Sequence, residues 1–99
     1  MAKYYLTNKA VEDLTQIWDY TFETWSEKQA DKYYNLLIDS CKEIAVNPKI
    51  GKNYEGVIKD LYGLRTMKHI VFYRIINPGK IEITRILHER MDLKNKLRE

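Results

Sequence analysis

The segments HIVFYRII, residues 69–76, and IEITRILH, residues 81–88, decide the fold of this chain. Both are rich in β-branched and aromatic residues, which favour strands. The residues between them, NPGK at 77–80, are typical of a tight turn, so the two segments predict an antiparallel β-hairpin. A shorter strand is expected over 64–68. The stretch 64–69 is short for two strand ends and a turn, so it does not fix the register between these strands.

The second of these segments carries a charged residue in an apolar alternation. Arg85 stands between the apolar positions of the strand and interrupts their spacing of two. One interpretation is structural: a β-bulge, or an ion pair with an acid such as Asp92 or Glu55. The other is a direct functional role for the guanidinium group.

Upstream, the pattern changes to that of helices. A short aromatic strand is expected over 3–6, and apolar residues then recur every three or four positions over 8–25, which predicts an amphipathic helix. Thr7 can cap this helix, and Asp13 lies near its N-terminus, where the helix dipole favours an acid.

A second amphipathic helix begins at once. Ser26–Gln29 has the form of a capping box, and Asn47-Pro48 ends the apolar pattern that follows. Because about one residue joins the two helices, they must fold back on each other as an antiparallel hairpin.

These elements predict a single α+β domain over residues 1–99. The order is β-α-α-β-β-β, with a loop over 49–63 and a short C-terminal helix over 91–97. The helical hairpin is expected to cover one face of a mostly antiparallel sheet of about four strands. The other face is expected to stay partly open and to gather Arg65, Tyr73, Arg74 and Arg85.

Charge is distributed unevenly along the chain. Residues 1–49 hold six Lys and eight Asp or Glu, whereas residues 50–99 hold eleven Lys or Arg and six Asp or Glu. The basic second half suits a phosphate-bearing or acidic protein partner, and a solvated sheet face is the alternative. Because the sequence has no apolar span and no apolar signal core, a cytoplasmic protein without membrane association is expected.

Few residues suit covalent or metal chemistry. Cys41, the single cysteine, falls on an apolar helix face and is expected to be a buried thiol. Ser26 is better explained as a helix cap and Ser40 as helix surface. His69 and His88 could meet across the hairpin, but two histidines do not define a metal site, so no metal or cofactor is expected.

A catalytic hypothesis remains, namely metal-independent RNA cleavage. Such cleavage needs a proton relay, which His69 or His88 could supply, and cations that stabilise the developing charge. The competing interpretation of Tyr73 is a core aromatic residue with its hydroxyl at the surface. The available cations are Arg65, Arg74, Arg85 and Arg90.

Taken together, the run 69–75 and the run IEITRILHERMD at 81–92 closely resemble the C-terminal half of ParE toxins, of the RelE/ParE superfamily of type II toxin–antitoxin systems. The resemblance extends over roughly residues 3–93. Further matches are Thr7-x-x-Ala10-x-x-Asp13-Leu14 with Ile17 and Tyr20, Gln29-Ala30-x-x-Tyr33-x-x-x-Leu37, and Pro48-x-x-Gly51.

The resemblance implies the same fold and a set of partners. ParE-like toxins are neutralised by an antitoxin whose C-terminal segment folds along the toxin, in a hetero-oligomer such as a 2:2 complex. The toxin contacts operator DNA only indirectly, through the antitoxin. A groove between the helical hairpin and the sheet, with a basic rim, is expected to bind the antitoxin's partly acidic C-terminal segment. Its surface could include some of Tyr4, Tyr5, Trp18, Trp25, Tyr33 and Tyr34, with half-buried tyrosines as the alternative.

The superfamily divides by target. ParE-like members inhibit DNA gyrase and stall it on cleaved DNA without hydrolytic chemistry, whereas RelE-like members cut mRNA in the ribosomal A site. No tyrosine follows Tyr73 and no histidine follows His88, which favours growth arrest through gyrase. The alternatives are a ribosome-dependent mRNA endonuclease and a remnant that only binds antitoxin.

The resemblance also indicates the residues on which activity would depend. Arg65, Arg74 and Arg90 are expected to contact the target. A scaffolding role is expected for Tyr73, Arg85, His88 and Asp92.

Overall fold

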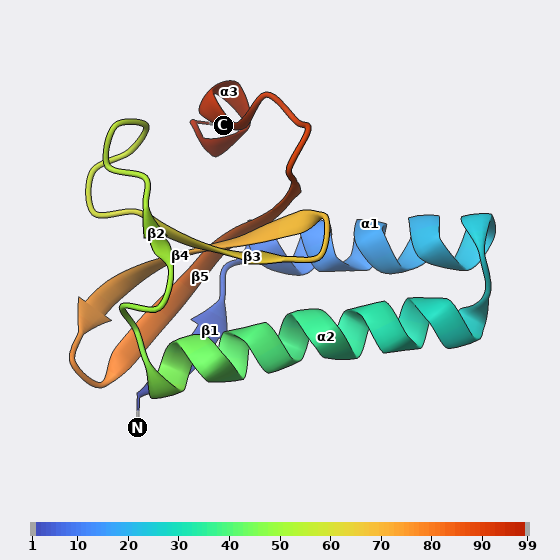
Figure 1. Cartoon of the computed structure of the whole chain (residues 1–99), viewed down its shortest axis with the longest axis horizontal. Helices are drawn as coiled ribbons and strands as arrows, with labels where there is room; N and C mark the ends of the chain where they lie inside the picture. The colour runs from blue at the N-terminus through green and yellow to red at the C-terminus, as the bar shows by residue number, and fades with distance from the viewer. Residues whose placement is uncertain (1, 99) are drawn as a thin grey trace.

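The computed structural model describes residues 2–98, with two long helices and a five-stranded sheet (Figure 1). Its elements are β1 (Lys3–Leu6), α1 (Asn8–Thr24), α2 (Glu27–Val46), β2 (Lys52–Asn53), β3 (Tyr62–Thr66), β4 (His69–Asn77), β5 (Lys80–His88) and α3 (Leu93–Leu97). The predicted order is confirmed, and the two-residue β2 is the strand that sequence analysis left within a loop.

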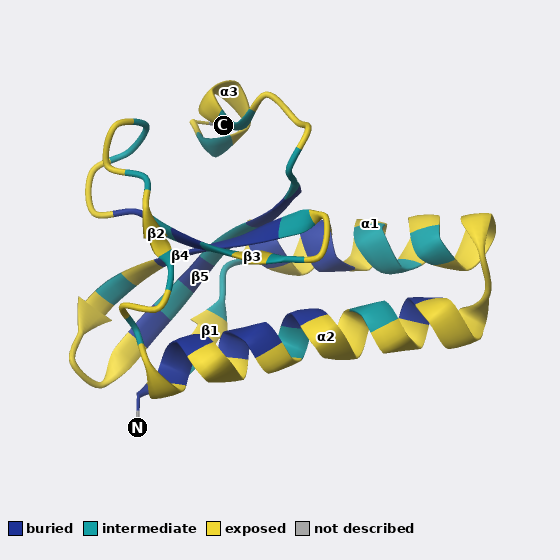
Figure 2. Ribbon diagram, in the orientation of Figure 1, coloured by how far each residue is buried: buried dark blue, intermediate teal, exposed yellow. Residues whose placement is uncertain are grey.

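The sheet is mostly antiparallel, as predicted. Its strand order is β1-β5-β4-β3-β2, and only β1 runs parallel to its neighbour, β5. Helices α1 and α2 form the predicted antiparallel hairpin, and their connected ends project beyond the sheet (Figure 1). Those ends are largely exposed, whereas the other end of α2 is buried where it faces the sheet (Figure 2).

Both helices begin at the predicted caps. The Thr7 hydroxyl accepts a hydrogen bond from the Ala10 amide, and the Ser26 hydroxyl accepts one from the Gln29 amide, each at 3.1 Å. These side chains satisfy amide groups that have no partner within the first helical turn.

The turn between β3 and β4 resolves the register that sequence analysis left open. Strand β3 begins at Tyr62 and ends at Thr66, two residues earlier than expected, and Thr66 pairs with His69. Met67 adopts a φ of 57°, which permits the two-residue connection at some steric cost. Arg65 therefore pairs with Ile70.

A bulge interrupts the main hairpin, as one interpretation of Arg85 predicted. Phe72 pairs with Arg85, but the next residue, Tyr73, pairs with Ile83, so Thr84 is the extra residue on β5.

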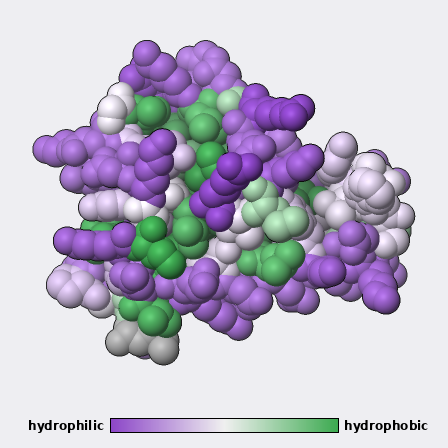
Figure 3. Space-filling view, in the orientation of Figure 1, coloured by the Kyte–Doolittle hydropathy of each residue, from purple (hydrophilic) through white to green (hydrophobic). Residues whose placement is uncertain are grey.

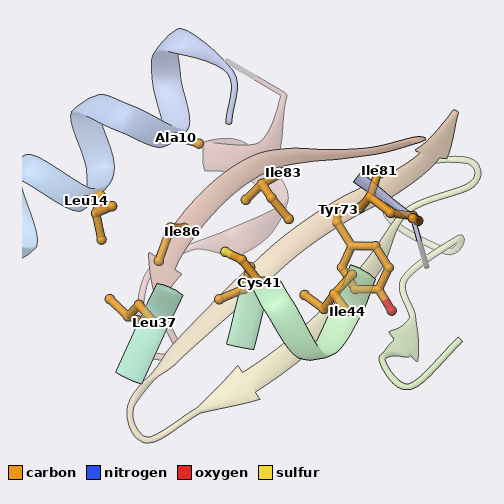
Figure 4. Close-up of a cluster of buried hydrophobic side chains, with 11 residues drawn as sticks. Ala10, Leu14, Leu37, Cys41, Ile44, Tyr73, Ile81, Ile83 and Ile86 are labelled. Carbon is orange, nitrogen blue, oxygen red and sulfur yellow. The ribbon is translucent and has the colours of Figure 1, made fainter. Parts of the chain in front are cut away.

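The main core lies between the sheet and the helical hairpin (Figure 4). Tyr73 is its largest side chain and is fully buried, together with Leu37 and Ile44 of α2. Cys41 is buried in the same core, as predicted, and burial raises the pKa of its thiol to about 11. At neutral pH this thiol is therefore protonated and a poor nucleophile.

A second core covers the sheet face that was expected to stay open. Ile70, Phe72 and Leu87 point to this side, where they pack with Leu61 and with residues of the 54–61 loop and α3. Figure 3 shows apolar atoms between this loop and α3, framed by hydrophilic surface. The expectation of an open face is wrong there because the loop and the tail fold back over it.

Candidate functional site

A groove of about 840 Å³ lies between the helical hairpin and one end of the sheet. Its walls come from α1, the start of α2, the β3–β4 turn and the end of β5. The apolar side chains that line it are Ile17, Tyr20, Trp25, Tyr33, Met67, Ile86, Leu87 and Met91. The groove expected between hairpin and sheet is thus present.

The rim of the groove is positively charged. Lys68 and Arg90 line the groove and are exposed, and among residues 2–98 neither has a carboxylate within salt-bridge distance. Asp13 also lines the groove, but Arg85 neutralises it. An apolar floor with two cations at its edge suits an amphipathic, acidic segment.

Asp13 and Arg85 form a buried ion pair that joins three elements. The Arg85 Nε and Nη2 donate to the two Asp13 carboxylate oxygens at 2.8 and 3.0 Å, and the Ile86 amide also donates to Asp13 at 3.0 Å. Arg85 Nη1 donates to the Lys96 carbonyl of α3 at 2.9 Å. The ion-pair interpretation of Arg85 is confirmed. The expected partners, Asp92 and Glu55, are wrong because the acid comes from α1.

Two histidines and a tyrosine meet on the helix-facing side of the sheet. His69 and His88 pair across the hairpin with ring centroids 5.2 Å apart, so the expected meeting is confirmed. Tyr33 Oη lies 2.5 Å from His69 Nδ1 and accepts a bond from the Lys68 amide at 3.4 Å. The Arg90 amide donates to His88 Nδ1 at 3.0 Å.

The electrostatic setting keeps His69 and Tyr33 uncharged at neutral pH. Burial, followed by the effect of His88, lowers the pKa of His69 to about 4, while Glu89 acts in the opposite direction. Burial raises the pKa of Tyr33, so its hydroxyl remains a donor at neutral pH. His69 is therefore a neutral imidazole at neutral pH.

Tyr73 does not join an exposed cationic cluster. Its ring is fully buried, and its hydroxyl donates to the Pro48 carbonyl at 2.7 Å and accepts from the Gly51 amide at 3.0 Å. The core interpretation of Tyr73 is confirmed, but the placement of its hydroxyl at an open surface is wrong. Tyr73 instead fixes the chain between α2 and β2.

The remaining predicted arginines are exposed at separate places. The Arg65 side chain is 68% exposed and forms an ion pair with Glu89 at 2.7 Å. Arg74 is exposed near the other end of the hairpin and pairs in register with Glu82. The expected gathering of Arg65, Tyr73, Arg74 and Arg85 on one open face is therefore wrong.

Three of the predicted residues, His88, Arg90 and Asp92, lie at or just after the end of β5. His88 faces the groove, Arg90 lines it, and Asp92 caps α3 by accepting bonds from the Asn95 amide and side chain at 3.4 and 2.7 Å. Asp92 thus has a scaffolding position.

One other expectation is wrong, and the exposure of the aromatic residues can now be stated. Ser40, expected on the helix surface, is buried and lies 2.5 Å from the Thr66 hydroxyl. Trp25, at the projecting end of the hairpin, is 72% exposed although it belongs to the apolar stripe of α1. Tyr5 and Tyr34 are exposed too, and the other aromatic residues considered, Tyr4, Trp18 and Tyr33, are half-buried.

Sequence reasoning missed Asp13 as a member of the site and the contact of Tyr33 with His69, although Tyr33 was considered as groove surface. An acid on the apolar stripe of α1, beside Ala10 and Leu14, was the available signal for a buried ion pair. Within residues 2–98, no cluster of three or more metal-ligating side chains occurs and no helix is long and apolar enough to span a membrane.

The sequence matches a family described as the ParE toxin of the type II toxin–antitoxin system parDE, over residues 4–93. The chain belongs to the ParE toxin family. The protein is therefore the toxin component of a type II toxin–antitoxin system.

Curated relatives agree with this membership. Toxin ParE1 of Mycobacterium tuberculosis is 33% identical over 96 residues, which cover 97% of this chain and 98% of the relative. Toxin ParE1 of Caulobacter vibrioides is 33% identical over 92 residues, or 93% and 94% of the two chains. Among solved structures, one described as the chromosomal ParDE TA system from P. aeruginosa shares the fold, with a TM-score of 0.77 and 22% identity, covering 89% of this chain and 96% of that one.

Proposed function

We propose that this ParE toxin arrests growth by inhibiting DNA gyrase in the cytoplasm and holding it on cleaved DNA, without a reaction of its own. The match to the ParE family over residues 4–93 carries this proposal. An inhibitor needs only to bind one state of its target more tightly than the others.

The positions of the proposed residues support a division of roles. Arg65, Arg74 and Arg90 are exposed and can contact a target. Tyr73 and Arg85 hold backbone groups of another segment, and His88 and Asp92 hold backbone amides two and three residues further along the chain, which supports a scaffolding role.

A cognate antitoxin is the proposed second partner, in a hetero-oligomer such as a 2:2 complex. We place an apolar, acidic segment of this antitoxin in the groove, because the groove has an apolar floor and two cations, Lys68 and Arg90, that form no salt bridge within residues 2–98. Operator DNA is reached only through the antitoxin.

Charge reversal at Arg90 tests the proposed target contact. Arg90→Glu should abolish growth arrest when the toxin is expressed without antitoxin, while circular dichroism shows an unchanged fold. Lys42→Glu is the matched control, since Lys42 is equally exposed but lies on α2 outside the groove. A folded Arg90→Glu toxin that still arrests growth would contradict the assignment.

Ribosome-dependent mRNA cleavage is the second candidate. The placement of His69, Tyr33 and His88 beside Arg90 in one groove favours it, because such cleavage needs a proton relay and a nearby cation. This candidate predicts cuts in A-site mRNA that His88→Ala abolishes. Cleavage that persists in that variant would remove the role of His88.

A further inference from the structure

We propose that His69 and His88 form a binding site for one carboxylate of the antitoxin, on the sheet side of the groove. This inference rests on the antitoxin binding proposed above and assigns the polar contact that positions the segment. Both imidazoles line the groove and are half-buried, and their rings meet edge to face.

The hydrogen bonds fix which nitrogen atoms are free. The Arg90 amide can only donate, so His88 Nδ1 is the acceptor and the neutral ring carries its proton on Nε2. Tyr33 Oη accepts from the Lys68 amide and has one hydrogen to donate, which goes to His69 Nδ1. His69 then also carries its proton on Nε2. Each ring offers an N–H donor, so the pair suits an acceptor oxygen rather than a metal ion, which needs a lone pair.

The charges around the pair favour an anionic acceptor. Lys68 comes from the β3–β4 turn and Arg90 from the segment after β5, and both line the groove. The two acids nearby are engaged elsewhere, Asp13 by Arg85 and Glu89 by Arg65. The titratable or charged groups near the pair are Tyr33 of α2, Asp13 of α1, Lys68, Glu89 and Arg90, and Arg65 of β3 pairs with Glu89.

Binding should take up a proton. In the free toxin the half-buried His69 resists a positive charge, because burial and the adjacent ring both disfavour it. A carboxylate placed against the Nε2 atoms reverses this preference and favours an imidazolium. The antitoxin should therefore bind more tightly as the pH falls toward about 6, within the range where histidine titrates.

Calorimetry of the full-length toxin with its cognate antitoxin tests the proposal. Titrations at about pH 6 and about pH 8, each in two buffers of different ionisation enthalpy, report both affinity and proton uptake. The proposal predicts about tenfold tighter binding at the lower pH, because uptake of one proton on binding strengthens affinity by up to about tenfold for each pH unit. His69→Gln and His88→Gln should lose both the pH dependence and the proton uptake, whereas the control Lys42→Gln should keep them.

A measurement on the wild-type toxin avoids any folding defect of the variants. Imidazole nuclear magnetic resonance spectra should show Nε2–H tautomers in the free toxin and a raised pKa for at least one ring in the complex. Affinity independent of pH with no proton uptake, or a pH dependence that survives both substitutions, would overturn the carboxylate site while leaving antitoxin binding intact. Absence of binding at both pH values would contradict the proposed antitoxin partner itself.

Discussion

At the scale of single residues, Asp13 connects the helical hairpin to the sheet. Strand β1 pairs with β5 only as far as Ile83, so the next part of β5 lacks a strand neighbour on that side. The Asp13 carboxylate takes that place by accepting a bond from the Ile86 amide, and it also holds Arg85. One carboxylate from α1 thus accepts hydrogen bonds from a backbone amide at the edge of β5 and from the Arg85 guanidinium.

Removing this charge should destabilise the fold strongly. Asp13→Asn removes the carboxylate that binds the largely buried Arg85 guanidinium and the Ile86 amide, so the free energy of unfolding should fall by about 3 kcal/mol. Denaturant unfolding followed by circular dichroism measures the change. Asp19→Asn is the control on the exposed side of α1 and should change stability by less than about 0.5 kcal/mol. Equal stability of the two variants would contradict the structural role of the pair.

His69 should make stability depend on pH. Its pKa of about 4 in the folded chain lies below the ordinary value of 6.5, so protonation favours the unfolded chain. Stability is then lost as the pH falls from about 6.5 through about 4. Because the ring is partly exposed, the loss should be about 1–2 kcal/mol. Unfolding of wild type and His69→Gln across this range tests it; an equal loss in both would show that His69 is not responsible.

The contacts of a single residue can be predicted from sequence only when they depend on residues close to it in the chain. The caps Thr7 and Ser26 were predictable because capping depends on residues three positions apart. The partner of Arg85 was not, since Asp13 is 72 positions away and meets it only through the fold.

At the scale of elements, the same distinction holds. The helices and the β4–β5 hairpin followed from periodicity and turn residues. Strand β2 exists only through its pairing with Tyr62 and Gly63 of β3, and the 54–61 loop is ordered by packing on Phe72. No periodic pattern within the loop encodes either contact.

Gly51 marks where the segment before β2 approaches the sheet. A Cβ at Gly51 would lie 2.6 Å from the Tyr73 hydroxyl and 2.9 Å from the Gly63 carbonyl. Gly51→Ala should therefore lower the free energy of unfolding by about 1–3 kcal/mol through overpacking. Gly56→Ala is the matched control, because a Cβ there meets no atom within 4 Å. Thermal unfolding compares them, and similar melting temperatures would contradict the close approach.

At the scale of the whole molecule, the hairpin β4–β5 contributes side chains to both hydrophobic cores and forms one wall of the groove. This sharing supports the prediction that residues 1–99 form one domain, which a single cooperative unfolding transition would test. The groove itself was expected from the resemblance to ParE toxins. The separation of Arg65, Arg74 and Arg90 was not, because it depends on the register of β3 and on the tail.

The central claim is that this ParE toxin acts on gyrase as a non-catalytic inhibitor. The most direct test is a gyrase supercoiling reaction with purified toxin and ATP, quenched with denaturant and scored for linear DNA. The account predicts that linear DNA accumulates with toxin and gyrase together, that none forms when gyrase is left out, and that added antitoxin prevents it. Unaffected supercoiling without linear DNA would contradict the claim and shift the proposal to mRNA cleavage at the ribosome.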